Sequence, residues 1–216
     1  MPGKLPKPDT GALSALNDSL RRVERAVRVS RAPTALLADA RAVLDDLAAK
    51  LAPHGDPGPY SQMTLRAGFP RPLDPELTQD ASRLFPYSPV VGPLNPISPP
   101  IEFEYRDGVV RAEAVFDARY AGPPGTRHGS VHGGVVALVM DELLGYVNVA
   151  NGIAGPTGTL TVRYLEFTPI GEPIRMEGRF VRREGRKIFA RGEFRHEGRV
   201  TAEAEGVFVT SVFPAP

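Results

Sequence analysis

The chain has 216 residues, with 26 Lys and Arg against 25 Asp and Glu, which gives a formal net charge of +1 at pH 7. That length suits one domain with an extension, and the near balance of charge provides no general attraction to nucleic acid or to an anionic membrane. The absence of cysteine excludes disulfides and thiolate metal sites. Because the first seven residues lack the apolar core of a signal peptide, we expect a cytoplasmic protein.

The first predicted element is a helical hairpin within an N-terminal extension, residues 1–53. Apolar side chains recur at helical spacing over residues 10–52, with an interruption at Ala32-Pro33. We expect the apolar stripe of the first helix to be core or dimer contact. The opposite face is expected to be exposed, with arginines that two acids partly neutralise: Arg21, Arg25, Arg28, Asp18 and Glu24.

The next segment, residues 54–100, is rich in proline and glycine. Proline fixes its own backbone angle and lacks the N–H that helices and sheets require, so this composition predicts an irregular connector. Aromatic residues within it, Phe69, Phe85 and Tyr87, indicate that the connector packs on a folded surface.

Residues 101–216 are expected to form an α+β domain. From Ile101 apolar and polar residues alternate, and Asp107-Gly108 predicts a tight hairpin turn. After a long apolar segment the alternation resumes in strands joined by turns at Glu184-Gly185 and Glu197-Gly198. The pattern predicts an antiparallel sheet, with one apolar face, wrapped around one long central helix.

That helix, within Val131–Ala150, carries the strongest functional signal. Its only formally charged side chains are Asp141 and Glu142, and it opens on Gly133-Gly134. A buried carboxylate is costly unless it is paired or used in chemistry. Glycines at a helix start leave backbone N–H groups open to a ligand with developing negative charge. Because the helix is short and acidic at its centre, we expect it not to span a membrane.

The spacing of these groups predicts a dimer. Gly133 and Asp141 are separated by about 12 Å along a helix axis, whereas a reacting carbonyl must lie about 3 Å from both its oxyanion donor and its base. Two antiparallel copies of the helix across a two-fold axis would bring the start of one to the middle of the other.

This order of elements, with His-Gly-Gly opening the helix and an aspartate nine positions after His132, resembles the hotdog-fold acyl-CoA thioesterases, in particular the phenylacetic-acid-degradation branch. The resemblance covers residues 101–213. It implies a hotdog fold, a homodimer or tetramer, and hydrolysis of an acyl-CoA thioester without metal or organic cofactor.

The resemblance also implies roles for individual residues. Gly133 or Gly134 would be the oxyanion donor, Asp141 the nucleophile or base, and His132 a residue that shapes the loop or touches the thioester. Thr157 would hold the attacking water. The second acid, Glu142, departs from the pattern, but it points about 100° away from Asp141 on a helix, so we favour Asp141 as the catalytic acid.

Two charged groups have open interpretations. Arg182, Arg183, Arg186 and Lys187 cluster at a predicted hairpin tip, where they either bind CoA phosphates or form a solvated turn. His128 and His132 have the spacing of a ligand pair, but Gly129 lies between them and no third ligand is evident, so we expect no metal.

Two alternative functions remain from the sequence. One is a hotdog hydratase or dehydratase, with His132 as the base facing Asp141. The other is a non-enzymatic acyl-CoA-sensing regulator whose helical hairpin binds DNA, although that hairpin lacks the concentrated basic face of a recognition helix. The length and identity of the acyl chain depend on packing that the pattern does not resolve.

Overall fold

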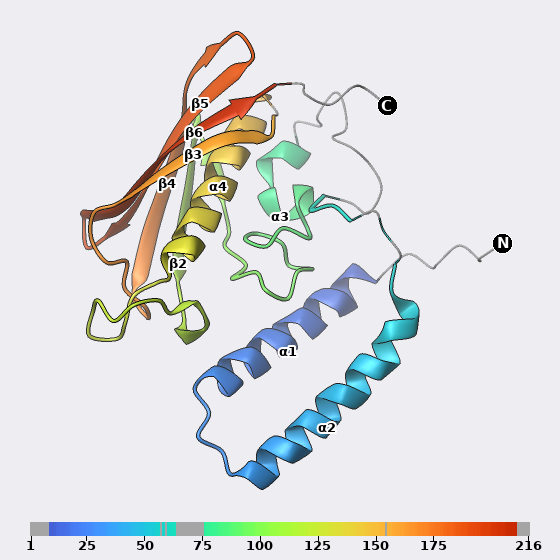
Figure 1. Cartoon of the computed structure of the whole chain (residues 1–216). Helices are drawn as coiled ribbons and strands as arrows, with labels where there is room; N and C mark the ends of the chain where they lie inside the picture. The colour runs from blue at the N-terminus through green and yellow to red at the C-terminus, as the bar shows by residue number, and fades with distance from the viewer. Residues whose placement is uncertain (1–8, 57, 59, 64–75, 154, 211–216) are drawn as a thin grey trace, which may run out of the picture.

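The computed structural model describes residues 9–56, 58, 60–63, 76–153 and 155–210. Within them, a six-stranded sheet curves around one long helix, and a pair of helices lies to one side (Figure 1). The helices are α1 (Thr10–Arg28), α2 (Thr34–Leu51), α3 (Ala81–Leu84) and α4 (Gly133–Ala150), with short 3-10 helices η1 (Ala52–His54), η2 (Leu77–Gln79) and η3 (Ala118–Tyr120). The strands are β1 (Glu104–Arg106), β2 (Val109–Val115), β3 (Thr157–Tyr164), β4 (Pro173–Glu184), β5 (Lys187–His196) and β6 (Arg199–Val209).

The sheet is antiparallel throughout, in the order β1-β2-β4-β5-β6-β3. The helix α4 connects β2 to β3, which joins the far edge beside β6. The predicted turn at Asp107-Gly108 is confirmed, with φ of 53° and 80°, as is the turn at Glu197-Gly198, with φ of 47° and 81°. Both residues of each pair have the positive φ of tight hairpin turns that match strand twist.

The first strand is shorter than its sequence pattern indicates. Ile101 and Phe103 are buried, yet β1 begins only at Glu104. The backbone N–H of Ile101 donates to the carbonyl of Val90 in the connector, 3.1 Å away. The N–H of Ile101 therefore bonds to the connector, whereas the alternating pattern predicted that it would pair within the sheet.

Three glycines let α4 lie close against the sheet. They occupy adjacent central strands, at Gly178 of β4, Gly192 of β5 and Gly206 of β6. A Cβ at position 178 would lie 2.9 Å from side-chain atoms of Leu143 and Val147, which is closer than packed carbon atoms approach. Larger residues here would push the helix off the sheet.

The Pro-rich connector covers the other side of α4. Its Leu84, Phe85, Val90 and Val91 are almost fully buried, and the hydroxyl of Tyr146 on α4 donates to the carbonyl of Thr78 at 2.9 Å. The prediction that the connector packs on a folded surface is confirmed for the described part, although Phe69 lies outside the described residues. α4 has the length and hydropathy of a membrane-spanning helix, and ten of its 18 residues are buried between sheet and connector in the described structure.

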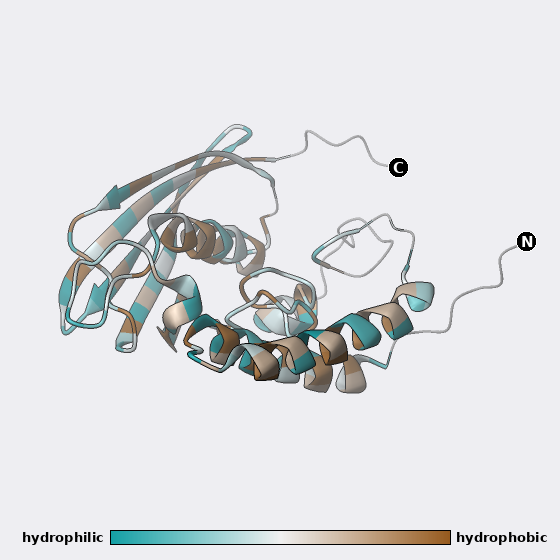
Figure 2. Cartoon of the chain, turned by 60° about the horizontal axis from the view of Figure 1, so that its bottom comes forward, coloured by the Kyte–Doolittle hydropathy of each residue, from teal (hydrophilic) through white to brown (hydrophobic). Residues whose placement is uncertain are grey.

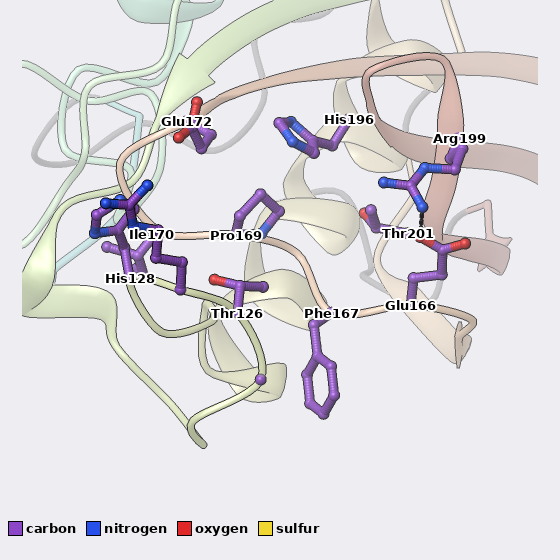
Figure 3. A pocket seen from close by; sticks show the side chains of 12 residues that line it. Thr126, His128, Glu166, Phe167, Pro169, Ile170, Glu172, His196, Arg199 and Thr201 are labelled. Carbon is purple, nitrogen blue, oxygen red and sulfur yellow. Dashed lines mark ion pairs between the residues drawn. The ribbon is translucent and has the colours of Figure 1, made fainter.

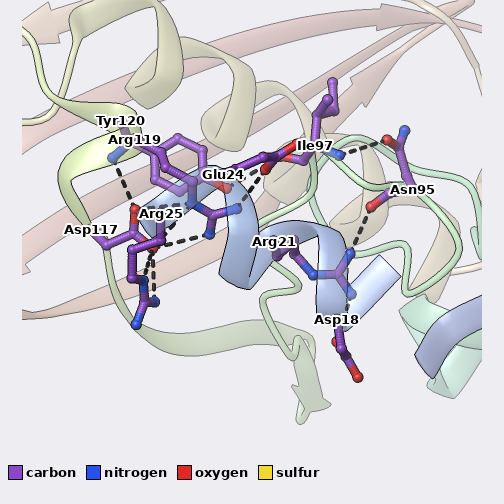
Figure 4. A network of polar contacts seen from close by, with 9 residues as sticks. All are labelled: Asp18, Arg21, Glu24, Arg25, Asn95, Ile97, Asp117, Arg119 and Tyr120. Carbon is purple, nitrogen blue, oxygen red and sulfur yellow. Dashed lines mark hydrogen bonds and ion pairs between the residues drawn. The ribbon is translucent and has the colours of Figure 1, made fainter. Parts of the chain in front are cut away.

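The N-terminal hairpin docks through polar residues, and the sequence prediction was wrong for one of them, Arg21, whereas Asp18, Glu24, Arg25 and Arg28 are exposed as predicted. Arg21, expected on an exposed face, is only 7% exposed, and its guanidinium donates to the carbonyl of Asn95 at 2.9 Å. Arg25 pairs with Asp117 at 2.8 Å, and Arg119 pairs with Glu24 at 3.0 Å (Figure 4). The connector presents backbone carbonyls that need donors, so α1 packs on it through Asn17 and Arg21, which bond the carbonyls of Pro93 and Asn95.

The rest of the hairpin is open. Figure 2 shows hydrophobic residues along both hairpin helices and along α4, which lies inside the curve of the sheet. Val27 of α1 is 60% exposed, and α2 buries none of its residues within the described structure. The predicted antiparallel sheet around a central helix, with a helical hairpin beside it, is confirmed.

Candidate active site

The start of α4 leaves one backbone N–H free. His132 caps the helix, with its Nδ1 accepting a hydrogen bond from the N–H of Gly134 at 3.0 Å. Across the described ranges, the N–H of Gly133 has no hydrogen-bond partner. Of the two glycines expected to be oxyanion donors, Gly133 is therefore the available one, and His132 is the residue that shapes this end of the helix.

Tyr164, at the end of β3, lies beside this free group. Its hydroxyl donates to the carbonyl of Gly133 at 2.8 Å, and a Cβ at position 133 would lie 3.4 Å from the tyrosine ring. The last residue of β3 thus holds the first peptide of α4 in place.

Asp141 lies at the opposite end of the same strand. Its Oδ1 accepts a hydrogen bond from the hydroxyl of Thr157, the first residue of β3, at 2.9 Å. Asp141 is half-buried and Thr157 is exposed, so solvent reaches this pair. The structure brings together the two residues that the sequence placed 16 positions apart, and it fixes the orientation of the carboxylate.

Glu142 points to the other side of α4, into the connector. Its Oε1 accepts a hydrogen bond from the hydroxyl of Ser88 at 2.8 Å, and that hydroxyl also accepts from the N–H groups of Val90 and Val91. Burial raises the pKa of Glu142 to about 7, the hydrogen bond from Ser88 opposes this rise, and the charge of Asp141 adds to it. The two neighbouring acids therefore occupy different environments.

Gly133 and Asp141 remain about 12 Å apart along the axis of α4, since the helix is regular between them. Within one chain they cannot bind the same carbonyl group. The strand β3 contacts both ends of this interval, with Tyr164 at the glycine end and Thr157 at the aspartate end.

A pocket of about 500 Å³ lies near the glycine end (Figure 3). It forms where the loop before α4 meets the segment after β3, and Val131 N–H donates to the carbonyl of Thr168 there. Its lining includes Arg127, His128 and Arg199, and Arg199 pairs with Glu166 at 3.5 Å. In the described part of the chain, no three His, Asp or Glu residues gather as a metal site.

The predicted basic cluster lies at the β4–β5 turn. The strand register places this turn at the Asp141 end of the fold: Arg183 lies opposite Ile188, Ile188 opposite Phe208, and Phe208 opposite Thr157. Its arginines already have partners. Arg182 bonds Glu184 at 2.6 Å and stacks 3.9 Å from the ring centre of Phe189. The guanidinium of Arg183 donates a hydrogen bond to the carbonyl of Gly185, and that of Arg186 donates to the carbonyl of Thr210. Lys187 is the first residue of β5.

Sequence reasoning missed two residues that hold the site, Tyr164 and Ser88. Tyr164 was only one position of an alternating strand, and Ser88 was one polar residue in a Pro-rich segment. Each acts on a residue far along the chain, 31 positions away for Tyr164 and 54 for Ser88. No local pattern signals such a pairing.

Comparisons with known proteins agree on the family. The family model of the thioesterase superfamily matches residues 128–203, which include α4 and β3 to β5. A crystal structure of a thioesterase superfamily protein is 33% identical, covers 94% of this chain and 92% of that chain, and superposes with a TM-score of 0.75. The comparison with curated proteins gave no match.

Two further solved structures each match 51% of this chain. A putative thioesterase from Ralstonia eutropha JMP134, described as phenylacetic acid degradation-related, is 21% identical, with 84% of that chain covered and a TM-score of 0.45. A hypothetical thioesterase from Streptococcus pneumoniae TIGR4, solved with coenzyme A, is 24% identical, with 89% covered and a TM-score of 0.46. The full-length match, the family model and the sheet wrapped around α4 together show that this chain belongs to the thioesterase superfamily and has the hotdog fold.

Proposed function

We propose that the protein is an acyl-CoA thioesterase, which hydrolyses an acyl-CoA to a free acid and CoA in a site shared by two subunits. One observation carries the proposal: α4 offers a free N–H at Gly133, and Asp141 is held in position by Thr157. An N–H donor for an oxyanion and an oriented carboxylate are the two groups that thioester hydrolysis requires.

A homodimer closes the gap between them. The strand β3 is an edge of the sheet, and six of its eight residues are exposed in one chain. An exposed edge of that length is ready to pair with another strand. Two β3 strands paired about a two-fold axis run antiparallel, so Tyr164 of one lies near Thr157 of the other. Gly133 of one protomer then faces Asp141 of its partner.

In the reaction we assign, Gly133 N–H binds the thioester oxygen as it becomes negative. Because Oδ1 of Asp141 already accepts from Thr157, its Oδ2 takes the proton of a water molecule. The water oxygen forms a bond to the carbonyl carbon, and the bond from carbon to sulfur then breaks. CoA leaves as a thiolate and takes up the proton, and no oxidant or reductant is needed.

Asp141→Asn tests the proposal, with Glu142→Gln as its neighbouring control. Thiol release from acyl-CoAs of increasing chain length should fall roughly 10²–10⁴-fold in Asp141→Asn, since the amide keeps the hydrogen bond to Thr157 but accepts no proton. Glu142→Gln should retain most of the turnover. A fully active Asp141→Asn protein, or a monomer in sedimentation at assay concentration, would contradict the mechanism.

Two assays separate the alternatives. Hydration of an enoyl-CoA without thiol release would identify a hydratase in place of a thioesterase. Single turnover in ¹⁸O-labelled water tests the role of Asp141. A base delivers the label only to the acid product, whereas a nucleophile forms a mixed anhydride with the acyl group, and label enters the Asp141 side chain when water attacks the aspartyl carbonyl.

A further inference from the structure

Asn148, in the last turn of α4, has a buried side chain without partners. It is 1% exposed, and neither its Oδ1 nor its Nδ2 has a hydrogen bond to any residue that the structure describes. An amide buried without hydrogen bonds costs free energy, and an apolar residue of similar size would avoid that cost. The unpaired amide therefore indicates a hydrogen-bonding partner from outside the single chain.

The position of Asn148 relates it to Asp141. Seven residues separate them, nearly two helical turns, so both lie on one face of α4, about 10 Å apart along the axis. This face is the one toward β3 and β6, because Asp141 bonds Thr157 and a Cβ at position 145 would approach Phe208. Asn148 thus follows Asp141 along the side of the helix that bears the reacting carboxylate.

Gly145 lies between the two residues on this face. A Cβ there would meet only Phe208 Cε1, at 3.8 Å, which is ordinary contact. In a helix interior glycine is unfavourable by roughly 0.5–1 kcal/mol relative to alanine, and here no close approach of the sheet requires it. Glycine adds no side chain at this position between the carboxylate and the amide, which the ring of Phe208 borders.

We propose that Asn148 determines acyl specificity by hydrogen bonding to a hydroxyl group on the acyl chain, about 10 Å from the thioester carbonyl. This inference rests on the proposed acyl-CoA hydrolysis. The acyl chain would run from Asp141 past Gly145 to the amide. A single hydroxyl can donate to Oδ1 and accept from Nδ2, which satisfies both unpaired atoms.

The charge of the helix favours a neutral group over an ionised one. Glu142 and Asp141 are the only charged residues of α4, and both are acidic, so a substrate carboxylate would meet no cation from this helix. An ammonium group would lose its hydration against one neutral amide. A hydroxyl carries neither cost.

A positional series of substrates tests the proposal directly. The hydroxyl is moved carbon by carbon along an otherwise saturated decanoyl-CoA, and kcat/KM for thiol release is compared with that of decanoyl-CoA. We expect one position, toward the far end of the chain, to exceed the unsubstituted ester by roughly 10- to 100-fold, because only that substrate satisfies the buried amide. A flat profile would overturn the inference.

Asn148→Leu and Asn151→Leu form a matched pair. Asn151 is also an asparagine at the end of α4, but it lies off the Asp141 face and its amide bonds Tyr105 and the carbonyl of Val147. Asn148→Leu should remove the preference while decanoyl-CoA remains a substrate, and Asn151→Leu should keep it. A preference that survives in Asn148→Leu would also overturn the inference.

Folding and function are checked separately. Removing an unpaired buried amide should leave the melting temperature of Asn148→Leu unchanged or raised, and Asn148→Met provides a second apolar variant if leucine does not fit. If no acyl-CoA in the series releases thiol, the proposed function fails, and the inference fails with it. If decanoyl-CoA is hydrolysed and the hydroxyl has no effect, only the inference fails.

Discussion

The partly buried acid Glu142 should make the protein less stable as the pH rises. Its carboxyl binds a proton more tightly in the folded chain, where burial raises the pKa to about 7, than in the unfolded chain, where the usual value is 4.5. Each tenfold difference in proton affinity is worth about 1.4 kcal/mol, so this difference corresponds to roughly 3 kcal/mol. Glu142→Gln removes the titrating proton and keeps an oxygen that can accept from Ser88.

The sign follows from proton binding. Below pH 4.5 both states carry the proton, and the stabilisation is fully present. Between pH 4.5 and 7 only the folded state retains it, so the free energy of unfolding falls as the pH rises, and above pH 7 the contribution is lost. Relative to wild type, Glu142→Gln should therefore gain stability over this interval.

The assay is urea unfolding at fixed protein concentration, at pH 5 and pH 8, for wild type and variant. The difference between the two proteins should change by roughly 3 kcal/mol, or about 6–12 °C in melting temperature for a chain of this size. Comparison at each pH cancels the titration of other groups and any constant cost of the glutamine amide. An equal difference at both pH values would refute the reasoning.

Ser88→Ala supplies a control that keeps the carboxyl. Its hydroxyl donates the hydrogen bond that opposes the rise in the pKa of Glu142, so the pKa should rise further without it. The decline in stability should then continue to higher pH than in wild type. A decline over the same pH range as in wild type would show that Ser88 does not act on this acid.

Two other predictions concern packing and substrate charge. Gly178→Ala should lower the free energy of unfolding by about 1–3 kcal/mol in urea titration, because its Cβ would lie 2.9 Å from Leu143 and Val147; an unchanged midpoint would mean that α4 shifts freely. The KM for acyl-CoA should rise several-fold in Arg127→Glu if the pocket near Gly133 binds CoA phosphates, and in Arg183→Glu if the β4–β5 turn does. If neither variant changes KM or its salt dependence, neither surface binds them.

Local patterns were sufficient for most of the fold. The onset of alternation near Ile101 predicted the sheet, which begins three residues later at Glu104, and Asp107-Gly108 predicted a turn that the structure bears out. The apolar helix with its glycine opening predicted α4. These predictions succeed because strand and helix periodicity, and the preference of Asp-Gly for such turns, are properties of neighbouring residues.

The N-terminal hairpin shows where pattern reasoning reaches its limit. The positions of α1 and α2 followed from spacing, but the burial of Arg21 did not. Arg21 is buried because Asn95, 74 residues away, presents a carbonyl to it. An arginine stripe looks solvent-exposed from its own helix, and only the partner surface decides otherwise.

By itself, the sequence determined that an apolar helix carries two adjacent acids behind a glycine pair, and helix geometry placed those acids on different faces. The tertiary structure decided what each face meets: Thr157 beside Asp141, Ser88 beside Glu142, and nothing within the described chain beside the amide of Asn148. The physical reason is that periodicity is a local property, whereas hydrogen-bond partners and burial depend on segments far apart in the chain.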